Sequence, residues 1–417
     1  MDYGLADDRS ATGYYTGFLC GSLMLGRAVG APFWGWVADQ WGRKPVLLIS
    51  LLSIAIGSLG LGLARNLETA VLSLLLAGVF CNLSATAKTC VSEVASGAKQ
   101  TRAMAFYALG WFYGQIAGYL IGGFLVHPEL SGLVTKGIVV TYPYLLPNLI
   151  CAAVSLLTFV GILVFFKETL AAPPATLSVP HDSFYLRSNK SLIAFYLLSV
   201  FCNTGFIETF PLWCWSSQEH GGLDLSTAEI GVTLTAAYVV LGLGQSWVYG
   251  WFARRLGLRK VVVGSSMLLC PVLVSISCLN LLPRLWLQPV LAFACLLFYL
   301  LSYNVFTSLF VLINRSVSQQ DRAKLNSCSM GVGYVVKGLT PLIVDFSFAY
   351  TSESGHRYPF DHHFMFTLLG LGTAVAAVLA AGLKWTEEEA KESYRDMEES
   401  RGSGELEISE VKFAGSN

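Results

Sequence analysis

Runs of about 20 predominantly apolar residues recur along this chain, and they constrain its fold more than any other feature. A helix of that length crosses the hydrocarbon core of a bilayer, where only helices or closed barrels satisfy all their backbone hydrogen bonds. We therefore predict an all-α, multi-pass integral membrane protein. Its eleven predicted spans cover residues 12–38, 45–64, 69–90, 103–126, 143–166, 191–214, 228–252, 261–282, 286–313, 326–350 and 363–383.

Composition supports this class and argues against others. Hydrophobic residues make up 54% of the chain and charged residues 13%, so the chain is more apolar than an ordinary globular protein. A net charge of zero offers no basic surface for nucleic acid. No pairing of nucleophile with base and no run of metal ligands is visible, so we predict no enzyme activity, no cofactor and no metal site. The predicted partners are the lipid bilayer and small solutes, and we expect a monomer.

A charged turn separates the first two predicted spans and returns in altered form half a chain later. The first charged turn, residues 35–44, reads GWVADQWGRK, and the second charged turn, residues 250–260, reads GWFARRLGLRK. This repetition indicates an internally duplicated membrane protein. The first copy follows one span whereas the second copy follows two spans of its half. We therefore expect one span to be missing before the first, through truncation or through loss.

Basic residues indicate how the chain is oriented. Lys and Arg concentrate in alternate loops, including both charged turns, and cytoplasmic loops retain such residues preferentially. This pattern predicts that the charged turns and the carboxyl terminus are cytoplasmic. The predicted organisation is a five-span bundle over residues 1–166, a cytoplasmic linker over 167–190, a six-span bundle over 191–383, and a charged, disordered tail over 384–417.

The first charged turn also carries a family resemblance. Its pattern of Gly35, Asp39, Gly42, Arg43 and Lys44 resembles the major facilitator superfamily. The neighbouring stretches MLGR at 24–27 and GRKPV at 42–46 are similar to the zinc-induced-facilitator-like and drug:proton antiporter branch. The resemblance implies twelve helices in two bundles, one more helix than the chain shows, and transport of small solutes by alternating access.

The resemblance implies that the first charged turn acts as a conformational latch, fastening the two bundles at the cytoplasmic face when the transporter is open on the other side. The alternative is that Arg43 and Lys44 only set the topology of the chain. The second copy is degenerate because Arg254 stands where the first copy has Asp39. The residues retained in the second copy are Gly250, Gly257, Arg259 and Lys260.

Glycines recur at every fourth position of the fourth predicted span. Gly114, Gly118 and Gly122, with Gly123 adjoining, would let a neighbouring helix approach closely. The spacing resembles an antiporter signature of the superfamily, although Tyr119 stands where proline is usual. Close helix packing without any meaning for antiport is the alternative interpretation.

Ionisable residues inside predicted spans are functional candidates, because charges in hydrocarbon are costly unless paired or hydrated. Glu208 lies among aromatic residues and is our candidate proton carrier, the alternative being a structural carboxylate near the outer mouth. Lys337 either attracts an anionic group or extends to the membrane interface. For Arg27 we favour a structural ion pair over contact with the solute. Asp345 and Lys88 complete the set, while Asn82, Gln115 and Gln245 are neutral candidates for hydrogen bonds with a solute.

These features together predict a secondary active transporter that moves a small organic solute, chelator-like or drug-like, by alternating access. We expect coupling to protons, with the proton gradient as the energy source, in the plasma membrane or a vacuolar or lysosomal membrane. An uncoupled uniporter is one alternative. A transport-inactive scaffold or sensor is another, because Leu74 and Gln40 replace arginines that are common in the family.

Overall fold

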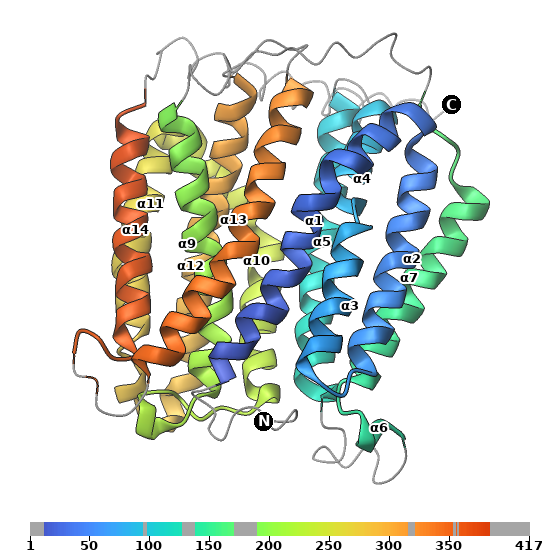
Figure 1. Ribbon diagram of the computed structural model, residues 1–417. Coiled ribbons are helices and arrows are strands. Elements are labelled where there is room, and N and C mark those ends of the chain that lie inside the picture. Colours follow the sequence, from blue (N-terminus) through green and yellow to red (C-terminus); the bar gives the residue numbers. More distant parts are fainter. Residues whose placement is uncertain are drawn as a thin grey trace, which may run out of the picture.

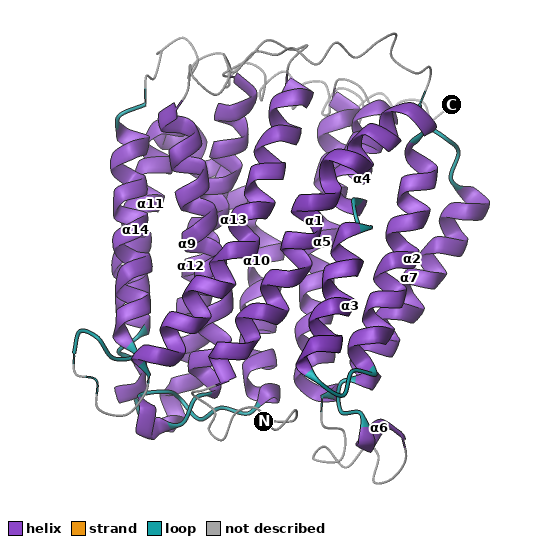
Figure 2. Cartoon of the chain, viewed as in Figure 1, coloured by secondary structure: helices purple, strands orange, loops and turns teal. Residues whose placement is uncertain are grey.

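The computed structural model describes residues 12–94, 98–126, 138–170, 190–315, 322–352, 356 and 358–383. Throughout this part of the chain every regular element is a helix (Figures 1 and 2). Most of the predicted linker and the whole predicted tail, residues 384–417, lie outside the described residues. The domain boundaries given above therefore stay predictions.

The helices fall into two successive sets along the chain. The first set comprises α1 (Gly13–Trp41), α2 (Arg43–Gly62), α3 (Leu67–Val79), α4 (Leu83–Val94), α5 (Ala98–Leu125), α6 (Ile138–Thr141) and α7 (Leu145–Phe165). The second set comprises α9 (Lys190–Trp215), α10 (Thr227–Leu256), α11 (Leu258–Ile276), α12 (Arg284–Arg315), α13 (Arg322–Thr351) and α14 (His363–Ala381).

The predicted spans all fall on helices, which confirms the fold class. Nine helical stretches of the described residues are long and apolar enough to cross a membrane. The other two predicted spans fall on α1 and α5, which have 29 and 28 residues. One predicted span, 69–90, is interrupted: α3 ends at Val79 and α4 begins at Leu83. The backbone N–H of Asn82 in this break donates to Ser50 Oγ of α2, at 2.9 Å.

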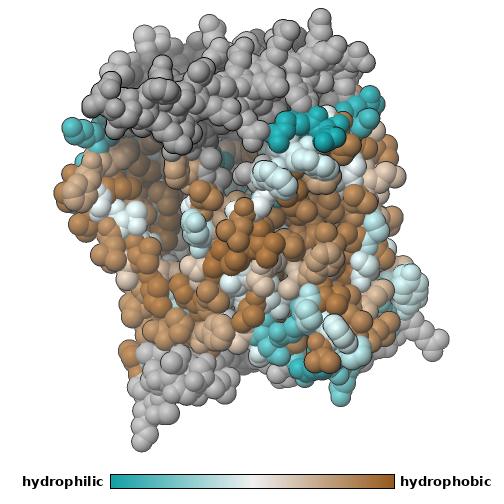
Figure 3. All heavy atoms as spheres, turned by 180° about the vertical axis from the view of Figure 1, so that it is seen from behind, coloured by the Kyte–Doolittle hydropathy of each residue, from teal (hydrophilic) through white to brown (hydrophobic). Residues whose placement is uncertain are grey.

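Large apolar side chains cover the outside of the molecule. Figure 3 shows hydrophobic residues over most of the described surface, with hydrophilic residues gathered toward its ends. α7 is an example, because Leu157 and Phe165 are 72% and 83% exposed although the helix is apolar nearly throughout. Such a surface suits contact with lipid rather than water.

Glycines bring helix backbones into direct contact within the first set. Gly26 and Gly30 of α1 face the carbonyl groups of Leu75 and Val79 on α3, so closely that a Cβ would overlap those oxygens. Gly78 of α3 meets α1 in the same way. Small residues allow this approach, which fixes α1 against α3 without help from large side chains.

Aromatic side chains fill the core of the second set. Phe206 of α9 stacks on Phe298 of α12 with ring centroids 3.7 Å apart, and both rings are almost completely buried. Trp213, also on α9, packs edge-on against Phe366 of α14 at 5.2 Å. Aromatic pairs of this kind stabilise a helix core beyond the area they bury. They hold α9, and with it the acidic residue Glu208, in a fixed position.

Candidate functional site

The first charged turn is built around a backbone conformation that only glycine adopts easily. Gly42 has φ = 105° and separates α1 from α2. The next residue, Arg43, is buried, and its guanidinium donates to Asp39 Oδ1 at 2.7 Å and to Glu93 Oε1 at 2.9 and 3.1 Å. Arg43 thus ties α1 and α2 to the end of α4. We call the end of the molecule that contains this turn the basic end.

Glu168, which follows α7, completes this cluster. Its carboxylate accepts hydrogen bonds from the backbone N–H groups of Arg43 and Lys44 at 2.8 and 2.9 Å, and so caps the first turn of α2. Lys44 Nζ reciprocates by donating to the carbonyl of Phe166 at 2.7 Å. Each charge sits at the helix end that its sign favours. Thr169 Oγ1 adds a bond to Glu93 Oε2 at 2.6 Å.

The partners of this cluster all come from the first set of helices. In the described part of the chain Arg43, Lys44 and Glu168 form no hydrogen bond or ion pair with α9–α14. The structure shows a clamp that joins α1, α2, α4 and α7. The predicted role as a latch between the two sets stays a prediction.

We expect Glu168→Gln to lower the melting temperature of the purified protein in a pH-dependent way. Partial burial raises the pKa of Glu168, but the N–H groups of Arg43, Lys44, Leu170 and Thr169 outweigh this and lower it overall. A carboxylate with a lowered pKa stabilises the fold above the pKa of the unfolded chain, about 4.3, and loses this effect as the pH falls through the folded value.

Thermal unfolding of wild type and Glu168→Gln between pH 4 and pH 8 measures this effect. The gap in melting temperature should be widest at neutral pH and should shrink in acid. Glu219→Gln, in an exposed 3₁₀ turn, is the control and should show no gap. A gap for Glu168→Gln that does not change with pH would contradict the capping role.

The second charged turn repeats the backbone of the first but not its ion pairs. Gly257 has φ = 80° and separates α10 from α11, as Gly42 separates α1 from α2. Arg259 is exposed, and among the described residues it donates only to the carbonyl of Ala381, at 3.2 Å; Lys260 is exposed too. Neither Gly35 nor Gly250 is in backbone contact with another helix in the described structure.

The two sets of helices meet through α1 and α13. A Cβ on Gly13, Gly17 or Gly21 of α1 would lie 2.7 Å from the carbonyl oxygens of Asp345, Pro341 and Gly338 respectively. These glycines occupy the first third of α1, away from the basic end. From there the two helices diverge (Figure 1). We call the end of the molecule where α1 begins the closed end.

α5 and α10 form a second junction between the sets. Gly123 near the end of α5 packs on the backbone of Thr227 and Gly231 near the start of α10, again at the closed end. Only Gly123 of the predicted glycine stripe makes such a contact. For Gly114, Gly118 and Gly122 the packing prediction is wrong in this conformation, because a Cβ there would meet no described atom within 4 Å. Their face of α5 is turned away from α10.

Two carboxyl groups lie at the junction of α1 with the second set. Glu208 of α9 shares a hydrogen bond with the thiol of Cys20 on α1. Asp345 of α13 is 1% exposed and accepts a bond from Thr16 Oγ1 of α1 at 3.4 Å, while its Oδ1 has no partner in the described structure. The two carboxyl groups are close enough to influence one another electrostatically. The sequence placed Glu208 among the candidates but assigned no role to Asp345.

Three basic side chains lie nearer the basic end, two of them on the same helices α1 and α13. Arg27 belongs to α1, Lys88 to α4 and Lys337 to α13, and the charges of Arg27 and Lys88 both act on Lys337. None of the three forms an ion pair with a described residue. The structural ion pair that we favoured for Arg27 is not found among the described residues, where its Nε is buried without a hydrogen-bond partner.

The neutral candidates lie at different places. Gln115 of α5 donates to the hydroxyl groups of Tyr119 and, across the junction, Tyr238 of α10, at 3.3 and 3.4 Å. Gln245 is buried in the second set, where it donates to Asn304 Oδ1 at 3.2 Å. Asn82 is buried in the break between α3 and α4. Gln115 and Gln245 thus make the helix–helix hydrogen bonds that were the alternative to solute binding.

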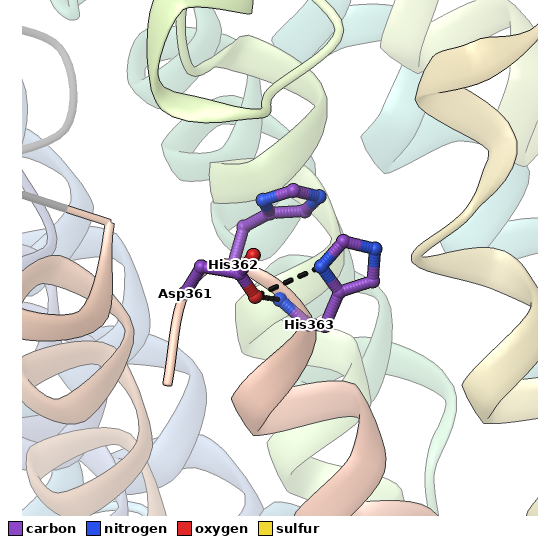
Figure 4. A group of neighbouring side chains, drawn as sticks. All are labelled: Asp361, His362 and His363. Carbon is purple, nitrogen blue, oxygen red and sulfur yellow. Dashed lines mark hydrogen bonds and ion pairs between the residues drawn. The ribbon is translucent and has the colours of Figure 1, made fainter. Parts of the chain in front are cut away.

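A cluster of metal-ligating residues was overlooked in the sequence, although its members are adjacent. Asp361, His362 and His363 precede or begin α14, and their ligand atoms all lie within 4.8 Å of one another (Figure 4). Asp361 Oδ1 accepts bonds from the backbone N–H and the ring Nδ1 of His363, at 3.0 and 2.8 Å. His362 Nε2 lies 3.2 Å from the amide nitrogen of Asn280.

These contacts give the cluster a structural role. Burial raises the pKa of Asp361, but its bonds with His363 have the larger effect and lower the pKa overall. Asp361 is therefore a carboxylate, and it caps α14 by accepting the backbone N–H of His363. Burial, with the nearby His363, lowers the pKa of His362 to about 4, which keeps its ring neutral near pH 7. Neutral imidazole and carboxylate are the forms that bind Zn²⁺, but here their ligand atoms already bond within the protein.

Comparisons with known proteins agree with this architecture. The family model for the Major Facilitator Superfamily matches residues 1–341. Protein ZINC INDUCED FACILITATOR 1 of Arabidopsis thaliana is 31% identical over 373 residues, which cover 82% of this chain and 76% of that protein. The class B tetracycline resistance protein of Escherichia coli is 24% identical over 252 residues, covering 59% of each.

Solved structures share the fold at low sequence identity. A D-xylose-proton symporter superposes with a TM-score of 0.67 at 16% identity, covering 91% of this chain and 89% of the symporter. The inward-open xylose transporter of E. coli gives 0.63 at 14% identity, covering 93% and 90%. With the duplicated turn, the two sets of helices and the family match together, the chain belongs to the major facilitator superfamily of membrane transporters.

Proposed function

We propose that this chain is a secondary active transporter that moves a small organic solute by alternating access and couples this movement to protons. The observation that carries the proposal is the position of Glu208, which is half-buried, and Asp345, which is buried: their carboxyl groups lie at the junction that alternating access has to open. Their partners Cys20 and Thr16 belong to α1, on the other side of that junction.

Protonation would control this junction through the energy of burial. A neutral carboxylic acid is far less costly to bury than a carboxylate, and it can hold the hydrogen bonds that join α9 and α13 to α1. Loss of the proton would favour exposure to water and hence separation of α1 from α13. The transporter would then close at the basic end and open at the closed end.

The relatives support outward transport. They include a tetracycline resistance protein and an efflux pump of Aspergillus niger, the latter 27% identical over 267 residues. The positive-inside rule places the basic end in the cytoplasm, so the described conformation would face the cytoplasm. We further propose that the chain has no catalytic activity, in line with its family.

We expect Glu208→Gln to abolish accumulation driven by a pH gradient. Glutamine keeps the size and hydrogen-bonding capacity of the neutral acid but cannot exchange a proton. Purified protein in liposomes, tested with radiolabelled tetracycline, a dicarboxylate and an amino-acid chelator, should accumulate at least one of them when a pH gradient is imposed. Glu208→Gln should reduce this accumulation about 100-fold or to background, within the range for a general acid–base group.

Glu219→Gln is the matched control, because Glu219 is an exposed carboxylate outside the membrane spans, and it should transport like the wild type. Accumulation by Glu208→Gln equal to that of the wild type would reject Glu208 as the proton carrier. A folded wild-type protein that moves none of the solutes would favour the scaffold or sensor alternative.

A further inference from the structure

Resting on the proposed transport function, we propose that Arg27, Lys88 and Lys337 together bind the negative group of the transported solute, which is a small organic anion bearing a carboxylate. The three side chains come from α1, α4 and α13, so the site is shared between both sets of helices. A solute bound there contacts both parts that move during alternating access.

The three basic side chains converge on one location. The charges of Arg27 and Lys88 both act on Lys337. Tyr334 of α13 lies within electrostatic reach of Arg27 and of Tyr107 on α5. Lys88 Nζ, from α4, lies 5.8 Å from the ring centroid of Tyr107, a separation typical of a cation–π contact. Four helices therefore contribute to one location.

Among the described residues, these three cations lack a counter-charge. No carboxylate among the described residues pairs with any of the three cations, and Arg27 Nε is buried without a partner. The carboxyl groups of Asp345 and Glu208 bond to α1 instead. Asp345 is eight residues beyond Lys337, about 12 Å along the helix. Like charges gathered in this way are costly in a membrane, and a bound anion offsets that cost.

Lys337 and Lys88 do not extend to the membrane interface. Lys337 is fifteen residues from the start of α13 at Arg322, about 22 Å along the helix, which exceeds the reach of a lysine side chain. Lys88 is also held inside, since its Nζ lies 5.5 Å from the ring centroid of Phe310 on α12 as well as near Tyr107. All three cations are only half-buried, so a solute can reach them.

The chemistry of the three groups indicates what they bind. The guanidinium of Arg27 is a planar fork that matches the two oxygens of a carboxylate, whereas the lysines are point charges suited to any additional anionic oxygen. The rings of Tyr107, Phe310 and Tyr334 provide an apolar surface for the body of the solute. An aromatic dicarboxylate fits this arrangement better than a cation or a neutral sugar does.

Phthalate and its uncharged diamide, phthalamide, test the proposal because they differ in charge but hardly in shape. The full chain in lipid nanodiscs, without any gradient, should bind phthalate by calorimetry, more weakly as salt rises, and should not bind phthalamide. Arg27→Gln, Lys88→Gln and Lys337→Gln should each weaken phthalate binding about 10-fold or more. Lys260→Gln, at an exposed lysine of the second charged turn, should change it less than about twofold.

Thermal unfolding separates a binding role from a structural one. Without ligand, Lys337→Gln should melt at or above the wild-type temperature, because it removes an unpaired charge, and phthalate should no longer raise that temperature. A lower melting temperature with phthalate binding intact would show that Lys337 is structural and would overturn the proposal. So would failure of the wild type to bind phthalate at about 50 mM, far above an ordinary affinity.

The same experiment keeps this inference distinct from the proposed function. Calorimetry measures equilibrium binding and not transport. Glu208→Gln should therefore bind phthalate as the wild type does, even when this variant fails to accumulate solute. Loss of proton-driven accumulation in every protein, together with phthalate binding that requires the three cations, would overturn the transport proposal while supporting the anion site.

Discussion

Gly17→Leu should abolish net transport while leaving the protein folded in the membrane. A Cβ at position 17 would lie 2.7 Å from the carbonyl oxygen of Pro341, 3.2 Å from its carbonyl carbon and 3.3 Å from the Cα of Leu342. All three are backbone atoms, so no rotation of a side chain relieves the overlap. Leucine would force α1 away from α13 at the closed end, and the transporter could not return to the conformation described here.

The thiol of Cys20 reports this separation directly, since it lies three residues from Gly17 and bonds to Glu208 across the junction. A membrane-impermeant maleimide, with the labelled peptide identified by mass spectrometry, should modify Cys20 faster in Gly17→Leu than in the wild type. Flux of any accumulated solute should fall about 100-fold or to background, the size of effect produced when one state becomes inaccessible.

Gly118→Leu is the matched control for this change. It makes the same substitution inside another transmembrane helix, at a position where a Cβ would meet no described atom within 4 Å. Flux and Cys20 labelling should match the wild type within about twofold, as expected of a substitution away from packed features. Wild-type flux in Gly17→Leu would show that contact between α1 and α13 at Gly17 is not part of the transport cycle.

The two glycine series show what sequence spacing can and cannot predict. Gly114, Gly118, Gly122 and Gly123 indicated a packed face of α5, but only Gly123 is in contact with α10. Spacing defines a stripe along a helix but not the rotation of that helix toward its neighbours. The tighter junction, at Gly17 and its neighbours on α1, has the same spacing and was not singled out, because nothing in the sequence shows which stripe faces α13.

The span prediction succeeded because it depends on a local property. An apolar run of about 20 residues forms a helix long and apolar enough to cross a membrane, whatever it packs against. The interruption between α3 and α4 could not be predicted in the same way. There the chain leaves the helix where Ser50 of α2 accepts the free N–H of Asn82, and that bond depends on tertiary contact.

For the candidate site too, the sequence predicted which residues are of interest but not which residues they contact. The cost of charge in a membrane drew attention to Arg27, Glu208 and Lys337 from the sequence. Their partners required the structure: a carboxylate was expected near Arg27, yet the nearby charge is another cation, Lys337. Glu168 belongs to a recognisable stretch, but its cap on α2 joins residues more than 120 positions apart in the chain.

Arg43→Gln should destabilise the protein far more than Arg259→Gln, its counterpart in the second charged turn. Arg43 is 9% exposed and bonds to both Asp39 and Glu93, which would be left without their cation. Removing one partner from a buried ion pair costs about 3–5 kcal/mol of stability. Asp39 is 40% exposed and Glu93 is 25% exposed, so water compensates part of this loss. We therefore expect Arg43→Gln to lower the free energy of unfolding by about 2 kcal/mol. Arg259 is exposed, with a single bond to a backbone carbonyl, and should contribute less than about 0.5 kcal/mol.

Unfolding in detergent micelles measures this difference, and labelling of Cys20 shows what the first charged turn does. Because every described partner of Arg43 belongs to the first set of helices, its removal should weaken that set without parting α1 from α13, so Cys20 should label at the wild-type rate. Slower or faster labelling at unchanged stability would instead support the latch between the two sets. Equal destabilisation by both substitutions would mean that the ion pairs of the first charged turn do not stabilise the protein beyond what the shared backbone turn does.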